Sequence, residues 1–261
     1  MWGHRRRSRL ACPKVKADFV ASGPPFRIGL GKTTPRYAVY YAPEASGALW
    51  RFGSSVLGYD AETGAEVAVL DGWPFREPDW PELTRDPRTY GFHGTLKAPF
   101  HLRAELKEPD LLAAARTFAA ERAPFDVPRL EVTTLGSFIA LVPAASEPSL
   151  DNLAADCVRS FDRFRAPLSA SDRARRLAAR LSERQLRHLD IWGYPYVFDD
   201  FRFHMTLTGP LPPELREPVR AALAARHAEV PPGARVDGIA VFRQDTREGR
   251  FRILQRFPFG L

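Results

Sequence analysis

The sequence lacks several features that would mark a well-known protein class. It has two cysteines in 261 residues, too few for a disulfide framework or a four-cysteine zinc site, which favours a cytoplasmic protein. It has no run of about 20 apolar residues, so we expect no membrane span. It also has no His-Glu-x-x-His, Cys-x-x-Cys or Gly-x-Ser-x-Gly motif. We therefore expect neither a metal nor a cofactor, and no serine nucleophile of the elbow type.

Excess charge is confined to one end of the chain. The formal net charge is +7, and residues 1–35 account for it with eight basic side chains against one acidic one, whereas residues 36–261 hold thirty of each. A basic protein often binds nucleic acid, but the balanced body gives no such indication. We expect residues 1–35 to be a disordered basic extension, with a nucleic-acid or targeting arm as the functional alternative.

One segment of this extension, residues 29–34, is similar to a phosphate-binding loop. The required first glycine falls at Phe26, and Pro35 blocks the helix that should follow closely. The sequence therefore does not support a nucleotide loop here.

The remaining residues alternate between strand and helix patterns, which favours an α+β protein. Strands are predicted at 36–41, 93–102, 125–134, 137–142, 201–208, 235–242 and 250–256. Helices are predicted at 109–122, at 149–191 with an interruption at Pro167, and at 213–229. The stretch 44–90, rich in Gly, Pro and Trp, is expected to hold loops and short pieces.

A repeat relates the two halves. His93-Gly-Thr-Leu-Lys-Ala-Pro and His204-Met-Thr-Leu-Thr-Gly-Pro lie 111 residues apart, and each precedes a helix and two strands. Such recurrence in one structural context indicates a duplicated unit. We expect two equivalent antiparallel sheets that face each other across a cleft.

Alternation along each strand places polar side chains on one face and apolar side chains on the other. On the polar faces lie His93, Thr95 and Lys97 of the first repeat and Arg202, His204, Thr206 and Thr208 of the second. Two histidines can supply an acid and a base together, because imidazole titrates near neutrality. Threonine hydroxyls and a lysine suit phosphoryl oxygens. The pattern predicts displacement at phosphorus without a metal.

Several motifs together carry a resemblance to a known family. They are Leu49-Trp50-Arg51-Phe52-Gly53, the segment from Tyr90 to Phe100, the segment from Trp192 to Phe198, and the segment from Phe201 to Gly209. The chain resembles the two-histidine (2H) phosphoesterase superfamily, and more narrowly its branch encoded beside phosphonate-degradation enzymes. The resemblance implies a bilobal, pseudo-twofold α+β fold over residues 36–261 as a single domain.

The resemblance also implies roles for the motif residues. His93 and His204 would transfer protons, in an order that the sequence leaves open, and Thr95 and Thr206 would hold the phosphate. Gly94 departs mildly from the family pattern, which more often has an apolar residue there. A cyclic phosphate diester of ribose, formed during phosphonate degradation, is the substrate that this family context implies.

Other residues are candidates for substrate contacts. We expect Tyr37, Tyr90 and Tyr196 to touch a ring or sugar, and Arg51 to hold a second phosphate. The expected partner is a small phosphorylated sugar or nucleotide, and the protein is expected to be a monomer. Two alternatives stay open: a 2′,3′-cyclic phosphodiesterase acting on RNA ends, and a module that binds a phosphorylated ligand without turnover.

Overall fold

The computed structural model describes residues 34–75 and 79–260, so the expectations for residues 1–33 lie outside the described residues. The strands of the main sheet are β1 (Arg36–Tyr41), β4 (Gly94–His101), β6 (Leu130–Leu135), β7 (Phe138–Pro143), β8 (Met205–Thr206), β10 (Gly238–Gln244) and β11 (Arg252–Pro258). Two short pairs are β2 (Tyr59–Asp60) with β3 (Ala65–Glu66) and β5 (Phe125–Val127) with β9 (Ala234–Val236).

The helices fall between these strands. They are α1 (Ala48–Leu57), α2 (Asp79–Leu83), α3 (Arg85–Tyr90), α4 (Glu108–Ala120), α5 (Pro148–Phe161), α6 (Ala170–Leu177), α7 (Glu183–Trp192) and α8 (Pro213–His227), with 3-10 turns η1 (Asp162–Phe164) and η2 (Phe198–Asp200). The predicted helices at 109–122 and 213–229 are confirmed. None of the helices in the described ranges is both long and apolar enough to cross a membrane.

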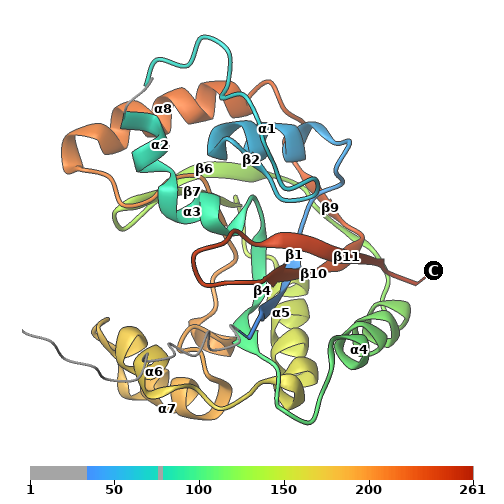
Figure 1. Ribbon diagram of the computed structural model, residues 1–261. Coiled ribbons are helices and arrows are strands. Elements are labelled where there is room, and N and C mark those ends of the chain that lie inside the picture. Colours follow the sequence, from blue (N-terminus) through green and yellow to red (C-terminus); the bar gives the residue numbers. More distant parts are fainter. Residues whose placement is uncertain (1–33, 76–78, 261) are drawn as a thin grey trace, which may run out of the picture. The chain divides into compact units, whose positions relative to one another are not determined.

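The main sheet joins the two repeats edge to edge. Within the described residues its strand order is β11-β10-β1-β4-β8-β7-β6, and neighbouring strands are antiparallel. The expected antiparallel α+β architecture is confirmed (Figure 1). The two expected sheets are joined into one, because β4 of the first repeat and β8 of the second meet through one residue pair, Gly94 with Met205. The two histidine motifs are therefore adjacent in the same sheet.

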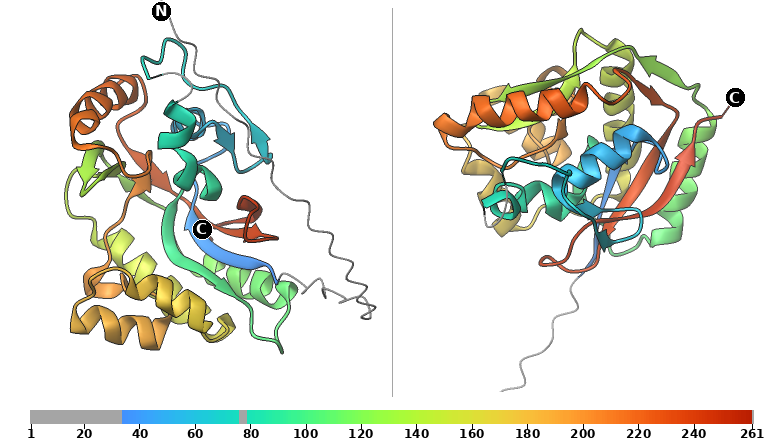
Figure 2. Two further views of the ribbon diagram at one scale, coloured as in Figure 1. Left: turned by 60° about the vertical axis from the view of Figure 1, so that its left-hand side comes forward. Right: turned by 90° about the horizontal axis from the view of Figure 1, so that it is seen from above.

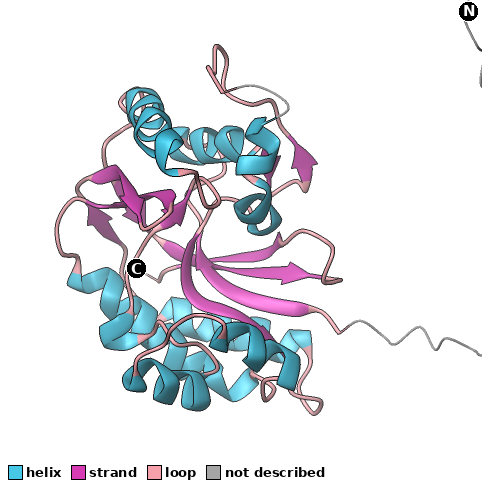
Figure 3. Ribbon diagram, turned by 90° about the vertical axis from the view of Figure 1, so that its left-hand side faces the viewer, coloured by secondary structure: helices cyan, strands magenta, loops and turns pink. Residues whose placement is uncertain are grey.

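Helices cover the backs of the strands. Helix α8 packs on β6 and β7, α4 packs on β10 and β11, and α5 packs on β4, an arrangement that Figures 1 and 2 show from several sides. In α4 the buried positions Leu111, Ala115 and Phe118 recur every three to four residues, as one helix face requires. Helix α6 buries no residue and lies beside α7, away from α8 (Figure 3).

The expectation of loops across 44–90 is wrong at one place, because α1 is a ten-residue helix. Its glycine and two serines lower intrinsic helix propensity, which obscured the pattern. Packing overrides propensity here. A Cβ at Gly53 would lie 2.2 Å from ring atoms of Phe92, a side chain with no exposed surface. Helix α1 thus fixes the residue that precedes His93.

Candidate functional site

The two repeat histidines are held in the same way. His93 lies just before β4, and its Nδ1 is 2.9 Å from the carbonyl oxygen of Gly91. His204 lies just before β8, and its Nδ1 is 2.8 Å from the carbonyl oxygen of Arg202. Because a carbonyl only accepts, each Nδ1 carries the hydrogen and donates. Each neutral ring therefore offers an unprotonated Nε2, the form that can accept a proton.

Strand pairing brings the histidines and threonines together. Gly94 lies opposite Met205, so in an antiparallel ladder the flanking residues His93 and Thr206 are cross-strand neighbours, as are Thr95 and His204. The two histidines are then diagonal neighbours, with Cα atoms about 7–8 Å apart. The Nε2 of His93 is 3.2 Å from the Thr95 hydroxyl oxygen. His93 thus contacts the threonine of its own repeat, while strand pairing sets each histidine beside the threonine of the other repeat.

Two glycines make this geometry possible. Gly91 has φ 74° and ψ 177°, a conformation that is essentially restricted to glycine, and its carbonyl orients His93. At Gly94 a Cβ would lie 2.5 Å from the ring of Phe203, so a larger residue would push β4 away from the second repeat. The departure of Gly94 from the family pattern therefore fits its position at the junction.

Tyr40 of β1 forms the wall beside His93. The two rings stack with centroids 3.7 Å apart and planes 18° apart, and Tyr40 is buried. Burial lowers the pKa of His93 to about 4, with a further lowering from His204, while the hydrogen bond to Gly91 opposes the shift. Burial and then the charge of Arg202 also lower the pKa of His204. Both rings are therefore neutral at pH 7 in the free protein.

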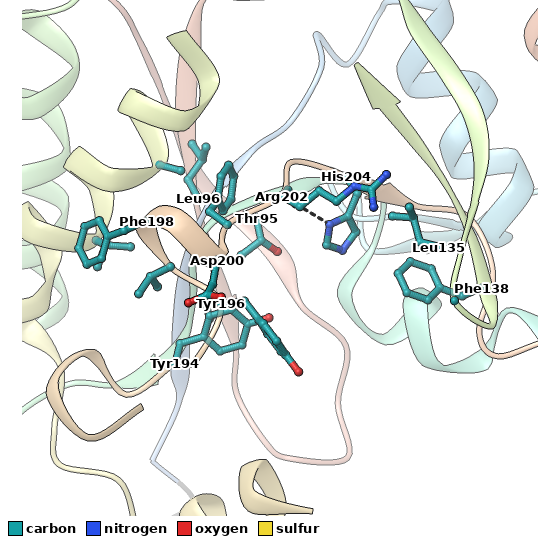
Figure 4. Close-up of a pocket in the computed structure, with 16 residues that line it drawn as sticks. Thr95, Leu96, Leu135, Phe138, Tyr194, Tyr196, Phe198, Asp200, Arg202 and His204 are labelled. Atoms are coloured by element: carbon teal, nitrogen blue, oxygen red, sulfur yellow. Dashed lines mark hydrogen bonds between the residues drawn. The ribbon is translucent and has the colours of Figure 1, made fainter. Parts of the chain in front are cut away.

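An aromatic cavity of about 320 Å³ opens at His204. Thr95 and His204 line it together with Phe138, Tyr194 and Tyr196. Figure 4 shows the imidazole of His204 between Thr95 and Phe138, with the two tyrosines on the neighbouring loop. The sequence placed Tyr196 and Arg202 near a substrate, and both line this cavity.

A second cavity, of about 360 Å³, opens at His93 and is basic. It shares Thr95, Ala98 and Tyr194 with the aromatic cavity, so the two meet beside the histidines. Thr206 and the expected Tyr90 also line it. Its charged and titratable lining groups among the described residues are Arg36, His93, His101, Arg165, Asp172, Arg175 and Arg176, together with the tyrosines.

The expectation that Lys97 shares the face of Thr95 is wrong. In the pairing of β1 with β4, Tyr40 lies opposite Thr95 and Val39 lies opposite Lys97, so one extra β4 residue forms a bulge between them. A bulge reverses the alternation of faces. Lys97 consequently points to the back of the sheet, is 3% exposed, and pairs with Asp162 at 3.0 Å.

A second bulge in β4 restores His101 to the front. His101 lies opposite Arg36, and both line the basic cavity. The strand runs through Pro99 without interruption. The structure places His101 in the cavity that contains His93.

Three other expected substrate contacts lie elsewhere. Thr208 is fully buried, donates to the Gly209 carbonyl at 2.9 Å and accepts from the Ile139 N–H at 3.0 Å, because β8 ends at Thr206 and alternation stops. Tyr37 points to the opposite face of β1 from Tyr40, where its hydroxyl donates to Glu108 at 2.9 Å.

Arg51 is the third of these residues. It is exposed on α1, donates to the Ser46 carbonyl, and lines neither the aromatic nor the basic cavity. The placement of Arg51 as the group that holds a second phosphate is therefore wrong.

Sequence reasoning missed the residues that complete the site. Tyr37 and Tyr40 are both tyrosines of the same predicted strand, so the sequence does not distinguish them. The register of β1 against β4 decides which of the two rings lies beside His93. Tyr194 lies inside the recognised segment from Trp192 to Phe198 but was not singled out. Arg176 lies on α6, a helix that buries no residue, and it lines the basic cavity.

No group of three or more His, Cys, Asp or Glu side chains within residues 34–75 and 79–260 is arranged to hold a metal ion. Asp200, which lines the aromatic cavity, accepts from Arg184 at 2.8 Å and 2.9 Å.

An antiparallel α+β fold with two histidines and two threonines at its central strand junction agrees with the resemblance to 2H phosphoesterases. The chain belongs to the family described as "Protein of unknown function (DUF1045)", whose profile matches residues 95–252, more than half of the chain.

Two curated relatives share 35% identity with the chain, and both are called "Ribose 1,5-bisphosphate phosphokinase PhnN". The match to the protein from Janthinobacterium sp. (strain Marseille) covers 86% of this chain and 51% of the relative. The match to the protein from Laribacter hongkongensis (strain HLHK9) covers 84% and 50%. The chain thus spans about half the length of these relatives.

Solved structures with a similar fold have low sequence identity. Protein TT0787 of Thermus thermophilus has a TM-score of 0.43 and 19% identity, over 86% of this chain and 97% of that one. LigT of E. coli, complexed with phosphate, has a TM-score of 0.40 and 12% identity, over 88% of this chain and 99% of that one.

Proposed function

We propose that this protein is a cyclic phosphodiesterase that hydrolyses a small cyclic phosphate without a metal. The observation that carries the proposal is the crossed arrangement at the strand junction. The observed pair of Gly94 with Met205 makes His93 a cross-strand neighbour of Thr206 and His204 a cross-strand neighbour of Thr95, by antiparallel geometry. Two proton-transfer groups and two hydroxyl donors can therefore surround one phosphorus atom.

The pKa shifts suggest which histidine takes which role. The pKa of His93 is lowered far, to about 4, and that of His204 is lowered less. His93 is then the neutral base at physiological pH. A bound phosphate anion favours an adjacent imidazolium, and His204 is the ring that protonates more readily. We therefore assign His93 as general base and His204 as general acid.

The reaction balances with these two groups. His93 Nε2 removes a proton from water as the water oxygen forms a bond to phosphorus. The bond from phosphorus to one ring oxygen breaks, and that oxygen takes the proton from His204 Nε2. The hydroxyls of Thr95 and Thr206 donate to the phosphoryl oxygens, where negative charge gathers. Each proton-transfer group supplies about 10²- to 10⁴-fold in rate.

The relatives support a phosphorylated sugar as substrate. Their name refers to a ribose bearing phosphate groups, and the family resemblance implies a ribosyl cyclic phosphate intermediate of phosphonate degradation. The kinase activity in that name is not proposed for this chain. The chain spans half of those proteins, and its segment most similar to a nucleotide loop, residues 29–34, has Phe26 where the first glycine is required.

One observation favours a second candidate, a cyclic phosphodiesterase for RNA ends. The aromatic cavity beside His204 contains Phe138, Tyr194 and Tyr196, and exposed aromatic rings can stack a nucleobase. A module that binds a phosphorylated ligand without turnover is the remaining alternative, and the paired histidines argue against it.

A panel of cyclic phosphates incubated with an excess of chelator tests the proposal. We expect hydrolysis that resists the chelator and that His93→Ala and His204→Ala each reduce by at least about 10²-fold. Circular dichroism and the unfolding midpoint of each variant serve as the control for folding. Loss of activity on chelation, with recovery on adding a divalent metal, would contradict the mechanism. Ring-opening hydrolysis that both histidine variants retain would contradict the site.

A further inference from the structure

The basic cavity contains more positive charge than its carboxylates balance. Arg165 pairs with Asp162 at 2.8 Å, and Arg175 pairs with Asp172 at 3.0 Å. Asp172 is the one carboxylate that lines this cavity among the described residues. Two further guanidinium groups line the cavity, those of Arg36 and Arg176.

Neither Arg36 nor Arg176 forms an ion pair with a carboxylate of the described ranges 34–75 and 79–260. Arg36 donates to the neutral amide oxygen of Gln244, at 2.7 Å from Nε. Arg176 lies over the ring of Tyr194, with its guanidinium carbon 4.9 Å from the ring centroid. Both arginines are half-buried. Partly buried cations without an acidic partner are costly unless an anion binds to them.

Arg36 and Arg176 line the same cavity as His93. Burial is the largest cause of the lowered pKa of Arg176; Tyr194 and Asp172 oppose it, and the charge of Arg36 adds a smaller lowering. Both arginines also act on Tyr40, the ring that stacks on His93 at 3.7 Å. His101 lies opposite Arg36 across the strands, and its Nδ1 donates to the Pro35 carbonyl at 3.1 Å.

We propose that Arg36 and Arg176 bind a terminal phosphate monoester carried by the same substrate whose cyclic phosphate lies between His93 and His204. This inference rests on the proposed function. Two guanidinium forks match the charge and the several acceptor oxygens of a phosphate dianion. The cavity volume of about 360 Å³ suits a small phosphosugar. The substrate class is therefore a cyclic phosphate of a sugar that also bears a second phosphate.

A matched substrate pair measures the contribution of this subsite. We would compare a ribonucleoside 2′,3′-cyclic phosphate with the same compound carrying a 5′-phosphate. The wild-type protein should show the higher kcat/KM for the 5′-phosphorylated compound. Arg36→Gln and Arg176→Gln should each lower that preference on the order of 10- to 100-fold, the size expected for a hydrogen bond to a charged group. Arg176→Lys should restore part of it.

Arg173→Gln is the matched control. Arg173 lies one turn earlier on α6, is exposed, and pairs with Asp190 at 2.8 Å outside this cavity. Its substitution should leave the preference at the wild-type value. If Arg173→Gln lowered the preference for the 5′-phosphorylated compound as much as Arg36→Gln and Arg176→Gln do, the effect would come from overall charge, and the assignment would be overturned.

Binding of ribose 5-phosphate and of ribose, measured by calorimetry, separates this inference from the proposed function. The phosphorylated sugar should bind to wild type and lose affinity in the two arginine variants. If it does so while no cyclic phosphate is hydrolysed, the subsite stands and the proposed function fails. Affinity that depends on His93 and not on the arginines would place this phosphate at the catalytic site and overturn the inference. Preference for an RNA oligonucleotide with a cyclic end would overturn it too.

Discussion

The imidazole of His93 stacks on the phenol ring of Tyr40, with centroids 3.7 Å apart. The contact joins β1 to the residue just before β4, since Tyr40 lies opposite Thr95 in the pairing of β1 with β4. It keeps water from one face of the imidazole. Because burial is the largest cause of the lowered pKa of His93, Tyr40 holds the proposed base in its neutral form.

Removing the Tyr40 ring should shift the pH dependence of activity. His93 has a pKa of about 4 against an ordinary value of 6.5, so it is neutral above about pH 5. In Tyr40→Ala, water reaches the ring and its pKa rises toward 6.5. A larger fraction is then protonated between pH 4 and 6.5, where kcat/KM should fall, with little change above pH 8.

Tyr40→Phe is the control for this experiment, because it keeps the stacked ring and removes only the hydroxyl. At acidic pH, the pH profile of kcat/KM for Tyr40→Phe should coincide with that of wild type. The titration of His93, followed by NMR, should shift upward in the alanine variant alone. An unchanged His93 titration in Tyr40→Ala would refute the role given to the stack.

The three threonines of the repeats should behave differently. Thr95→Val and Thr206→Val remove proposed donors to phosphoryl oxygens, and each should lower kcat/KM by about 10²-fold. Thr208→Val should keep kcat/KM within a few-fold of wild type and instead lower the free energy of unfolding by about 1–3 kcal/mol, because it leaves a buried N–H without its partner. Steady-state kinetics and urea unfolding measure the two effects. Equal kinetic losses in all three variants would contradict the assignment.

The buried pair of Lys97 and Asp162 should matter for stability rather than for turnover. Burial is the largest cause of the lowered pKa of Lys97, and Asp162 opposes it. Asp162→Ala leaves that cation uncompensated and should cost about 3–5 kcal/mol in unfolding free energy. Lys97→Met removes the buried charge itself and should cost less. Lys97→Met should also keep its kcat, because the side chain lies on the back of the sheet. A large loss of kcat in a stable Lys97→Met protein would contradict the placement of Lys97 on the back of the sheet, away from the substrate.

The junction between the repeats should be sensitive to a single methyl group. In Gly94→Ala the added Cβ would meet the Phe203 ring at 2.5 Å, and overpacking of this kind costs about 1–3 kcal/mol. Turnover should fall as well, because β4 and β8 hold the two histidines. Phe203→Leu in the Gly94→Ala background should recover part of both losses. If the losses of stability and turnover in the double variant were the sum of those in the two single variants, the clash between the added Cβ and Phe203 would not be their cause.

The local sequence pattern was sufficient to predict many of the helices and strands. The helix at 213–229 and the strand at 36–41 follow from apolar periodicity and β propensity, which neighbouring residues decide. The predicted strand at 201–208 was too long, because β8 pairs only over Met205 and Thr206. Helix α1 was missed because its Gly53 serves a contact with Phe92 that lies 39 positions away in the chain.

The sequence by itself determined the identity of the two His-x-Thr motifs and the antiparallel α+β class, because both depend on residues close together in the chain. Tertiary structure decided which side chains surround them. Two bulges in β4 turned Lys97 away from the front and returned His101 to it, and strand register selected Tyr40 over Tyr37. A bulge or a one-residue change of register moves a side chain to the other face. Such pairing arises only between strands distant in sequence, and that is why local pattern could not supply it.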